Sequence, residues 1–167
     1  MKVEITDLKL RYQDEKKEIL KAVHKVLKSG KLVLSDSNQK FESVIRKLTG
    51  AKYCLGLNSG TDALMMALWS LGVGKNDEVI TSPISFVATA NSIIHVGAKP
   101  VFIDVDEDLN INPNLIEKAI TKKTKAIMPV HWTGRVCNMH KISQIAKKHK
   151  LFVIEDAAQA VGAFFDK

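Results

Sequence analysis

Two short segments of this chain combine residue types that could hold a charged, planar ligand. The first is Asn58-Ser-Gly-Thr-Asp-Ala-Leu64, where a glycine and two hydroxyl side chains lead into an apolar helical pattern. The second is Val153-Ile-Glu-Asp-Ala-Ala-Gln159, an apolar run that ends in carboxyl and amide side chains. A turn that enters a helix suits a phosphate, and a carboxylate at the end of a strand suits a cationic ring nitrogen. Together the two segments predict a site for pyridoxal phosphate.

Ser59, Gly60 and Thr61 are the candidate phosphate ligands of the first segment. Gly60 would let the backbone approach closely, and the first N–H groups of the helix point outward at the positive end of its dipole. The two hydroxyls would add further donors. The same residues also fit an ordinary Ser/Thr helix cap, because the segment is neither a Walker loop nor a Gly-x-Gly-x-x-Gly fingerprint.

Four other residues could hold the ring of such a ligand. Phe86 begins a helical pattern and could lie over a planar group, although a core phenylalanine fits the same pattern. Asp156 would keep a pyridine nitrogen protonated, and the protonated ring would then withdraw electrons from the carbon that loses its proton. Gln159 could donate to a phenolic oxygen, and Ala158 is small enough for a flat ring to approach.

Helical and strand patterns alternate along the chain and should bring these segments to one edge of a sheet. Helices are predicted at 14–29, 38–48, 61–71, 86–95, 113–120 and 139–149, and strands at 53–57, 78–81, 100–104, 125–129 and 151–155. Most of the strands are short apolar runs, as expected of parallel strands covered on both faces. The pattern predicts an α/β three-layer sandwich with a mainly parallel sheet. His131 and Trp132 should lie at the same edge, with no role assigned.

The length and composition limit the classes of protein that this chain can represent. Its 167 residues fit one domain, with a helical lead-in at 1–50 and an α/β core at 51–167. The net charge is +7, but no aromatic residues interleave with the dispersed lysines, so no nucleic-acid partner is expected. No apolar stretch reaches the length of a membrane span, and an acid stands where a signal peptide would be apolar. We therefore expect a cytoplasmic protein that does not enter a membrane.

No metal site is predicted. The segment Asp104-Val-Asp-Glu-Asp108 begins like a calcium loop, but Leu109 stands where the sixth residue should be glycine. His131, Cys137 and His140 have a loosely metal-like spacing without a fourth ligand, which zinc would require.

Five segments, in this order and spacing, resemble the DegT/StrS family of sugar aminotransferases. They are Ser59-Gly-Thr-Asp-Ala-Leu64, Gly74-Lys-Asn-Asp-Glu-Val-Ile-Thr-Ser82, Phe86-Val-Ala-Thr-Ala-Asn91, Gly97-Ala-Lys-Pro-Val-Phe-Ile-Asp-Val105 and Val153-Ile-Glu-Asp-Ala-Ala-Gln-Ala160. The resemblance runs from about residue 15 to the last residue. It implies a truncated major domain of a fold-type-I transferase that depends on pyridoxal phosphate.

The resemblance also implies a role for each candidate site residue. The 59–61 segment would hold the cofactor phosphate. Phe86 would stack on the pyridine ring, and Asp156 would pair with its nitrogen. Gln159 would contact the phenolic oxygen, beside the small Ala158.

Members of the family transfer an amino group, typically from glutamate, to a keto sugar carried on a nucleotide. They continue beyond this chain to the lysine that forms the Schiff base and to a small C-terminal domain. The resemblance therefore implies the N-terminal half of such an enzyme, without a catalytic residue of its own, and Lys167 is not assigned the lysine's role. Two alternatives stay open: the dehydratase branch of the family, and a non-catalytic module for anion binding or oligomerisation.

A homodimer is the expected assembly. The resemblance implies active sites built at a dimer interface. The helix predicted at 14–29 would also leave an apolar stripe uncovered, which includes Ile19, Val23 and Val26.

Overall fold

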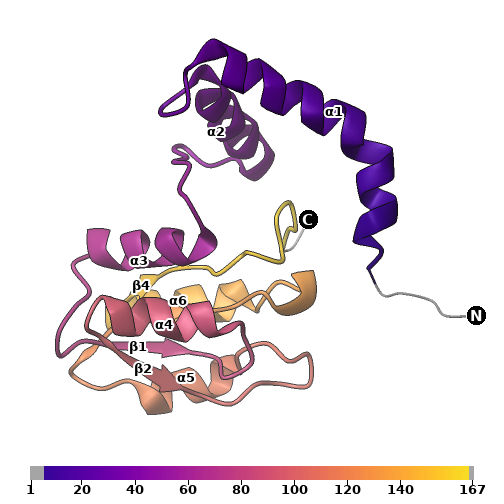
Figure 1. Ribbon diagram of the computed structural model, residues 1–167. Coiled ribbons are helices and arrows are strands. Elements are labelled where there is room, and N and C mark those ends of the chain that lie inside the picture. The colour runs from indigo at the N-terminus through magenta and orange to yellow at the C-terminus, as the bar shows by residue number, and fades with distance from the viewer. Residues whose placement is uncertain (1–5, 166–167) are drawn as a thin grey trace, which may run out of the picture. The chain divides into compact units, whose positions relative to one another are not determined.

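The structure, a computed structural model, describes residues 6–165. The chain divides into two compact units, Met1–Gly56 and Leu57–Lys167, which we call the helical unit and the α/β unit. In Figure 1 the helical unit is coloured indigo to violet and the α/β unit magenta to yellow. The single domain expected from the sequence stays a prediction. Lys167, which was not assigned a catalytic role, lies outside the described residues.

The helical unit consists of α1 (Leu8–Ser29) and α2 (Asp36–Thr49). The α1 helix begins six residues before the predicted start because the Asp7 side chain accepts a hydrogen bond from the Leu10 N–H at 2.8 Å and caps the first turn. Each helix ends at a glycine with a left-handed backbone, at Gly30 and Gly50. Among their described residues, neither helix contains one that is fully buried.

In the α/β unit α-helices and strands alternate, with one short 3₁₀ helix inserted between the third strand and the last helix. They are α3 (Gly60–Ser70), β1 (Glu78–Thr81), α4 (Val87–His95), β2 (Lys99–Phe102), α5 (Pro113–Ala119), β3 (Thr124–Met128), the short 3₁₀ helix η1 (Trp132–Gly134), α6 (Met139–His149) and β4 (Phe152–Val153). Each corresponds to a predicted element, except that η1 was not predicted. The β4 strand is shorter than the predicted 151–155, since its pairing with β3 is interrupted after Val153.

The strand predicted at 53–57 is wrong. Residues 53–57 have no regular secondary structure, and the four-stranded sheet contains only later segments. The apolar side chains that suggested a strand are largely exposed, with Tyr53 at 78% and Leu55 at 75% of their full accessibility. An apolar run forms a strand only where another strand offers hydrogen-bond partners, and among the described residues none pairs with this one.

The α/β unit has three layers, which confirms the predicted fold class. Its sheet is entirely parallel, in the order β2-β1-β3-β4. Successive side chains of a strand point to opposite faces, so Val79 packs with α3 and α4 while the neighbouring Ile80 packs with α5 and α6. Figure 1 shows these helices around the strands.

The order of the strands creates a crevice at the carboxyl ends of β1 and β3. The chain passes from β1 to β2 on one side, and then crosses to β3 and β4 on the other side of β1. The loops that follow β1 and β3 therefore lead away from each other, which in parallel sheets is where ligands bind.

Over the described residues, no helix combines the length and the apolar character that a membrane span requires.

Candidate functional site

A cavity of about 190 Å³ lies at the crevice between β1 and β3. Its lining includes six of the seven predicted site residues: Gly60, Thr61, Phe86, Asp156, Ala158 and Gln159. They come from the start of α3, the loop before α4 and the segment after β4. Segments almost a hundred residues apart thus meet as the sequence predicted. Ser59 is the predicted residue that does not line the cavity.

Ser59 instead acts as the N-cap of α3. Its hydroxyl oxygen accepts a hydrogen bond from the Asp62 N–H at 3.1 Å and donates to the Asp62 carboxylate at 3.0 Å. The cap leaves Gly60 and Thr61, in the first turn, to face the cavity at the positive end of the helix dipole. A Cβ atom at Gly60 would meet no other atom within 4 Å, so this side of the glycine is open.

The backbone of Asp156 is fixed to the end of β3. Its N–H donates to the Pro129 carbonyl at 2.9 Å, and its carbonyl accepts from the His131 N–H at 3.1 Å. This bridge resumes parallel pairing after β4 ends and sets Asp156 at the carboxyl edge of the sheet. The half-buried carboxylate accepts from the Thr89 hydroxyl at 2.6 Å and, more weakly, from the Ala158 N–H at 3.3 Å.

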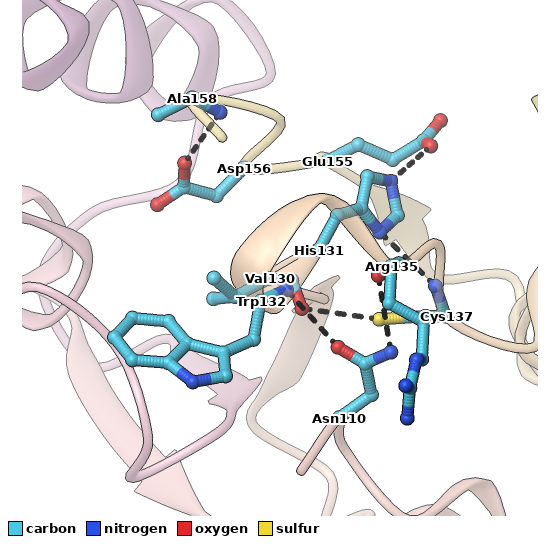
Figure 2. A network of polar contacts seen from close by, with 9 residues as sticks. All are labelled: Asn110, Val130, His131, Trp132, Arg135, Cys137, Glu155, Asp156 and Ala158. Carbon is cyan, nitrogen blue, oxygen red and sulfur yellow. Dashed lines mark hydrogen bonds and ion pairs between the residues drawn. The ribbon is translucent and has the colours of Figure 1, made fainter. Parts of the chain in front are cut away.

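His131 is a buried wall of the cavity, and Figure 2 shows its polar contacts. Its Nδ1 accepts from the Cys137 N–H at 3.2 Å, so the ring proton is on Nε2, which donates to the Glu155 carboxylate at 2.8 Å. This hydrogen bond holds the pKa of Glu155 below its usual value. The Cys137 thiol donates to the Val130 carbonyl at 3.2 Å, and burial raises its pKa to about 12. The sequence placed His131 at this edge, and its contacts give it a role in fixing the loop after β3.

Asn110 is a second buried residue that fixes this loop, and sequence reasoning missed it. Its amide oxygen accepts from the Trp132 N–H at 3.1 Å, while its amide nitrogen donates to the Arg135 carbonyl and the Asp108 carboxylate, both at 3.1 Å. Figure 2 shows Asn110 between Trp132 and Arg135. An asparagine that is 2% exposed inside an acidic loop is unusual, because buried amides need partners for every polar atom. Its burial was not readable from the sequence.

Gln159 is oriented by the η1 turn. Its side-chain oxygen accepts from the Thr133 N–H at 2.7 Å, which leaves the amide N–H groups as the donors of this side chain. The adjacent Gly134 has φ of +86°, and a Cβ there would come within 3.1 Å of the Gln159 carbonyl oxygen. The close approach of the two segments therefore requires glycine at this position.

A cavity at the carboxyl ends of parallel strands, with a helix N-terminus on one side and a carboxylate on another, defines a class of α/β proteins that bind anionic ligands with a ring. Among the described residues, no group of His, Cys, Asp and Glu side chains lies close enough together to hold a metal ion.

This chain belongs to the DegT/DnrJ/EryC1/StrS aminotransferase family, whose model matches residues 13–167. A pleiotropic regulatory protein of Geobacillus stearothermophilus is 46% identical over 99% of this chain and 45% of its own length. A dTDP-3-amino-3,4,6-trideoxy-alpha-D-glucose transaminase of Micromonospora megalomicea subsp. nigra is 43% identical over 92% of this chain and 41% of its own length. The chain thus spans less than half of these relatives.

Solved structures of similar proteins have the same fold. NtdA of Bacillus subtilis with bound cofactor PMP matches with a TM-score of 0.87 and 41% identity, over 89% of this chain and 34% of that chain. DesV of S. venezuelae matches with a TM-score of 0.92 and 38% identity, over 96% of this chain and 43% of that chain. The resemblance stated from the sequence is confirmed, as is the fold class.

Proposed function

We propose that this chain is the cofactor-binding part of an aminotransferase that uses pyridoxal phosphate to move an amino group from glutamate to a nucleotide-linked keto sugar, in amino sugar biosynthesis. One observation carries the proposal: the cavity has the N-terminus of α3 on one wall and the Asp156 carboxylate on another. Relatives named as transaminases of dTDP- and UDP-linked sugars support amino transfer to a nucleotide sugar rather than dehydration.

The start of α3 fits the phosphate of this cofactor. A phosphate dianion is favoured by the positive end of a helix dipole and by backbone N–H groups that have no partner in the helix. Gly60 and Thr61 provide these groups, and the open side of Gly60 leaves room for phosphate oxygens. Thr61 adds a hydroxyl. Ser59 contributes through the backbone that it caps, since its own hydroxyl is engaged with Asp62.

The segment after β4 fits the ring. Asp156 retains free lone pairs beyond its two hydrogen bonds and would hold the proton on the ring nitrogen. Phe86 would cover one face of the ring and exclude water, while Ala158 leaves space and Gln159 directs an N–H donor into the cavity. When bound, the cofactor supplies an electron-withdrawing ring that takes up the charge left as a substrate carbon loses its proton.

The described residues provide no amine for a covalent link to the cofactor, because no lysine among them lines the cavity. We therefore propose that this chain binds pyridoxal phosphate without a covalent bond and does not turn over substrate. Borohydride reduction followed by mass spectrometry tests this, because only a covalent imine is trapped. Labelling of one lysine at a single position would overturn it.

Titration of the chain with pyridoxal phosphate, followed by absorbance and fluorescence, tests the proposed site. Thr61→Ala removes a donor to a charged acceptor and should weaken binding by about 1.5–3 kcal/mol, or roughly 10- to 150-fold in Kd. Asp156→Ala should also weaken binding. Ser70→Ala is the matched control at the far end of α3, where the hydroxyl bonds only to the Ala67 carbonyl. No binding by the unmodified chain, or equal Kd values for Thr61→Ala and the control, would contradict the proposal.

We further propose a cytoplasmic homodimer that associates through α1. The apolar residues Ile19, Leu20 and Val23 are each between 42% and 51% exposed, which is costly for side chains of this size. Val23→Glu should shift sedimentation velocity toward the monomer. Lys21→Glu changes charge on the same helix without touching the stripe, and should not. A monomer at high concentration for the unmodified chain would contradict the proposal.

A further inference from the structure

Thr89, in the first turn of α4, links this helix to the Asp156 carboxylate. Its hydroxyl lies 2.6 Å from Asp156 Oδ2 and also 2.6 Å from the Ser85 hydroxyl. Thr89 is 1% exposed, whereas Ser85 lines the cavity. The contact joins residues 67 positions apart, and both hydrogen bonds are short.

The direction of these hydrogen bonds follows from the donors that are present. An ionised carboxylate only accepts, so Thr89 gives its one proton to Asp156. The oxygen of Thr89 can then only accept from Ser85. The three side chains therefore form an ordered chain from Ser85 through Thr89 to Asp156, in which each bond polarises the next.

The bond from Thr89 to Asp156 is not needed to satisfy a buried hydroxyl. A threonine in a helix can donate to a backbone carbonyl one turn earlier, and Ser92, in the same helix and also buried, does so with the Thr89 carbonyl at 2.8 Å. Thr89 reaches across to a different segment instead. At 2.6 Å, its hydrogen bond to the carboxylate is also shorter than the other one that the carboxylate accepts, from the Ala158 N–H at 3.3 Å.

We propose that Thr89, supported by Ser85, is the positioning residue that orients the Asp156 carboxylate toward the ring nitrogen of the cofactor. The proposal rests on the proposed function for the identity of that ring. The backbone bonds of Asp156 to Pro129 and His131 fix its position in the sheet but leave its side-chain torsions free. Thr89 removes this freedom, so that the carboxylate is already aimed when the ring arrives.

Two measurements on the unmodified chain and its variants test this proposal. The first is the cofactor-free crystal structure. In Thr89→Val, which keeps the shape and removes the hydroxyl, the Asp156 carboxylate should rotate or become disordered. In Thr89→Ser and in the control Ser92→Ala it should stay in place. An unchanged Asp156 in Thr89→Val would overturn the proposal, whether or not the chain binds the cofactor.

The second measurement is the ¹⁵N chemical shift of labelled pyridoxal phosphate bound to each variant, followed as a function of pH. In Thr89→Val the ring nitrogen should lose its proton at a pH lower by about one unit, a roughly tenfold change in proton affinity. Thr89→Ser should restore the original profile, and Ser92→Ala should not change it. Equal profiles for Thr89→Val and the unmodified chain would overturn the proposal.

Failure of this inference can be told apart from failure of the proposed function. If the unmodified chain does not bind pyridoxal phosphate, the proposed function fails, and the crystal structure of Thr89→Val still decides whether Thr89 positions Asp156. If Thr89→Val does not fold, both measurements are made on Ser85→Ala instead. This variant removes the hydroxyl that supports Thr89 without altering a buried residue. A partial shift in the same direction is then expected, and no shift would overturn the proposal.

Discussion

The helical unit and the α/β unit differ in where their apolar side chains lie. In the α/β unit, Leu68, Ile80 and Ile127 are completely buried between the sheet and its helices. In the helical unit, Leu20 and Val23 are about half exposed, although α1 is amphipathic. Two helices of this kind lack a core of their own. The comparison indicates that the α/β unit can carry the stability of the chain and the cavity, while the helical unit has a surface suited to association.

The largest expected effect concerns the cores of the two units. Leu68→Ala leaves a cavity under α3 and should lower the free energy of unfolding by roughly 2–5 kcal/mol. Leu20→Ala, which removes the same atoms from a half-exposed site, should cost less than about 1 kcal/mol in the monomer. Urea unfolding followed by circular dichroism measures both. Equal costs would mean that α1 is as well packed as α3.

A smaller effect is expected at two of the glycines with positive φ, Gly134 at the end of η1 and Gly50 just after α2. Gly134→Ala combines a left-handed backbone with a close approach to the Gln159 carbonyl, and should cost roughly 2–3 kcal/mol. Gly50→Ala, at φ of +70° with no atom within 4 Å, should cost roughly 1 kcal/mol. Thermal unfolding compares them. A cost at Gly134 no greater than at Gly50 would show that the η1 turn can move away from Gln159.

The cost of replacing an asparagine by alanine should also differ between the two units. Asn110→Ala leaves the Trp132 N–H and the Arg135 carbonyl without their partner, at a cost of about 1–3 kcal/mol. Asn38→Ala, on the exposed surface of α2, should change stability by less than about 0.5 kcal/mol. Urea unfolding of the two variants at pH 7 measures both costs. An unchanged free energy of unfolding in Asn110→Ala would mean that Asn110 does not fix the loop after β3.

The smallest effect is a dependence of stability on pH. The hydrogen bond from His131 lowers the pKa of Glu155 in the folded chain, so its contribution is present above the unfolded pKa and is lost as pH falls through the folded pKa. Because Glu155 is half exposed, solvent screening limits the effect to less than about 1 kcal/mol. Measured by urea unfolding from pH 7 down to pH 3, the loss of stability should be smaller for Glu155→Gln than for the unmodified chain. In α1, Glu15→Gln removes only an exposed ion pair with Arg11 and serves as control.

Local signals were sufficient to predict most helices of the fold. The α6 helix has the predicted bounds, and its N-cap Asn138 accepts from the Lys141 N–H at 3.1 Å. Strand pairing was harder to predict, because it depends on partners far away in the chain. The apolar run at 53–57 looked like a strand but has none to pair with among the described residues, and β4 contains only Phe152 and Val153.

The candidate site divides in the same way between local and distant signals. Gly60 and Asp156 stand at positions that the alternation of helices and strands places at one edge, so the sequence predicted their meeting. Thr89 and Asn110 act through contacts with residues 67 and 22 positions away, which no local pattern records. For Thr89, the sequence offered one signal of a role at the site: its hydroxyl stands one helical turn after Phe86.

Thiol chemistry on this chain should be confined to one position. The thiolate is the form of cysteine that attacks a maleimide. Cys137 keeps its proton at neutral pH, since its pKa is about 12 and its Sγ is buried against the Val130 carbonyl. Cys54, in the helical unit, is partly exposed. A dye added at neutral pH therefore marks the helical unit alone and leaves the loop beside the cavity unmodified, so that fluorescence can follow one unit without disturbing the other.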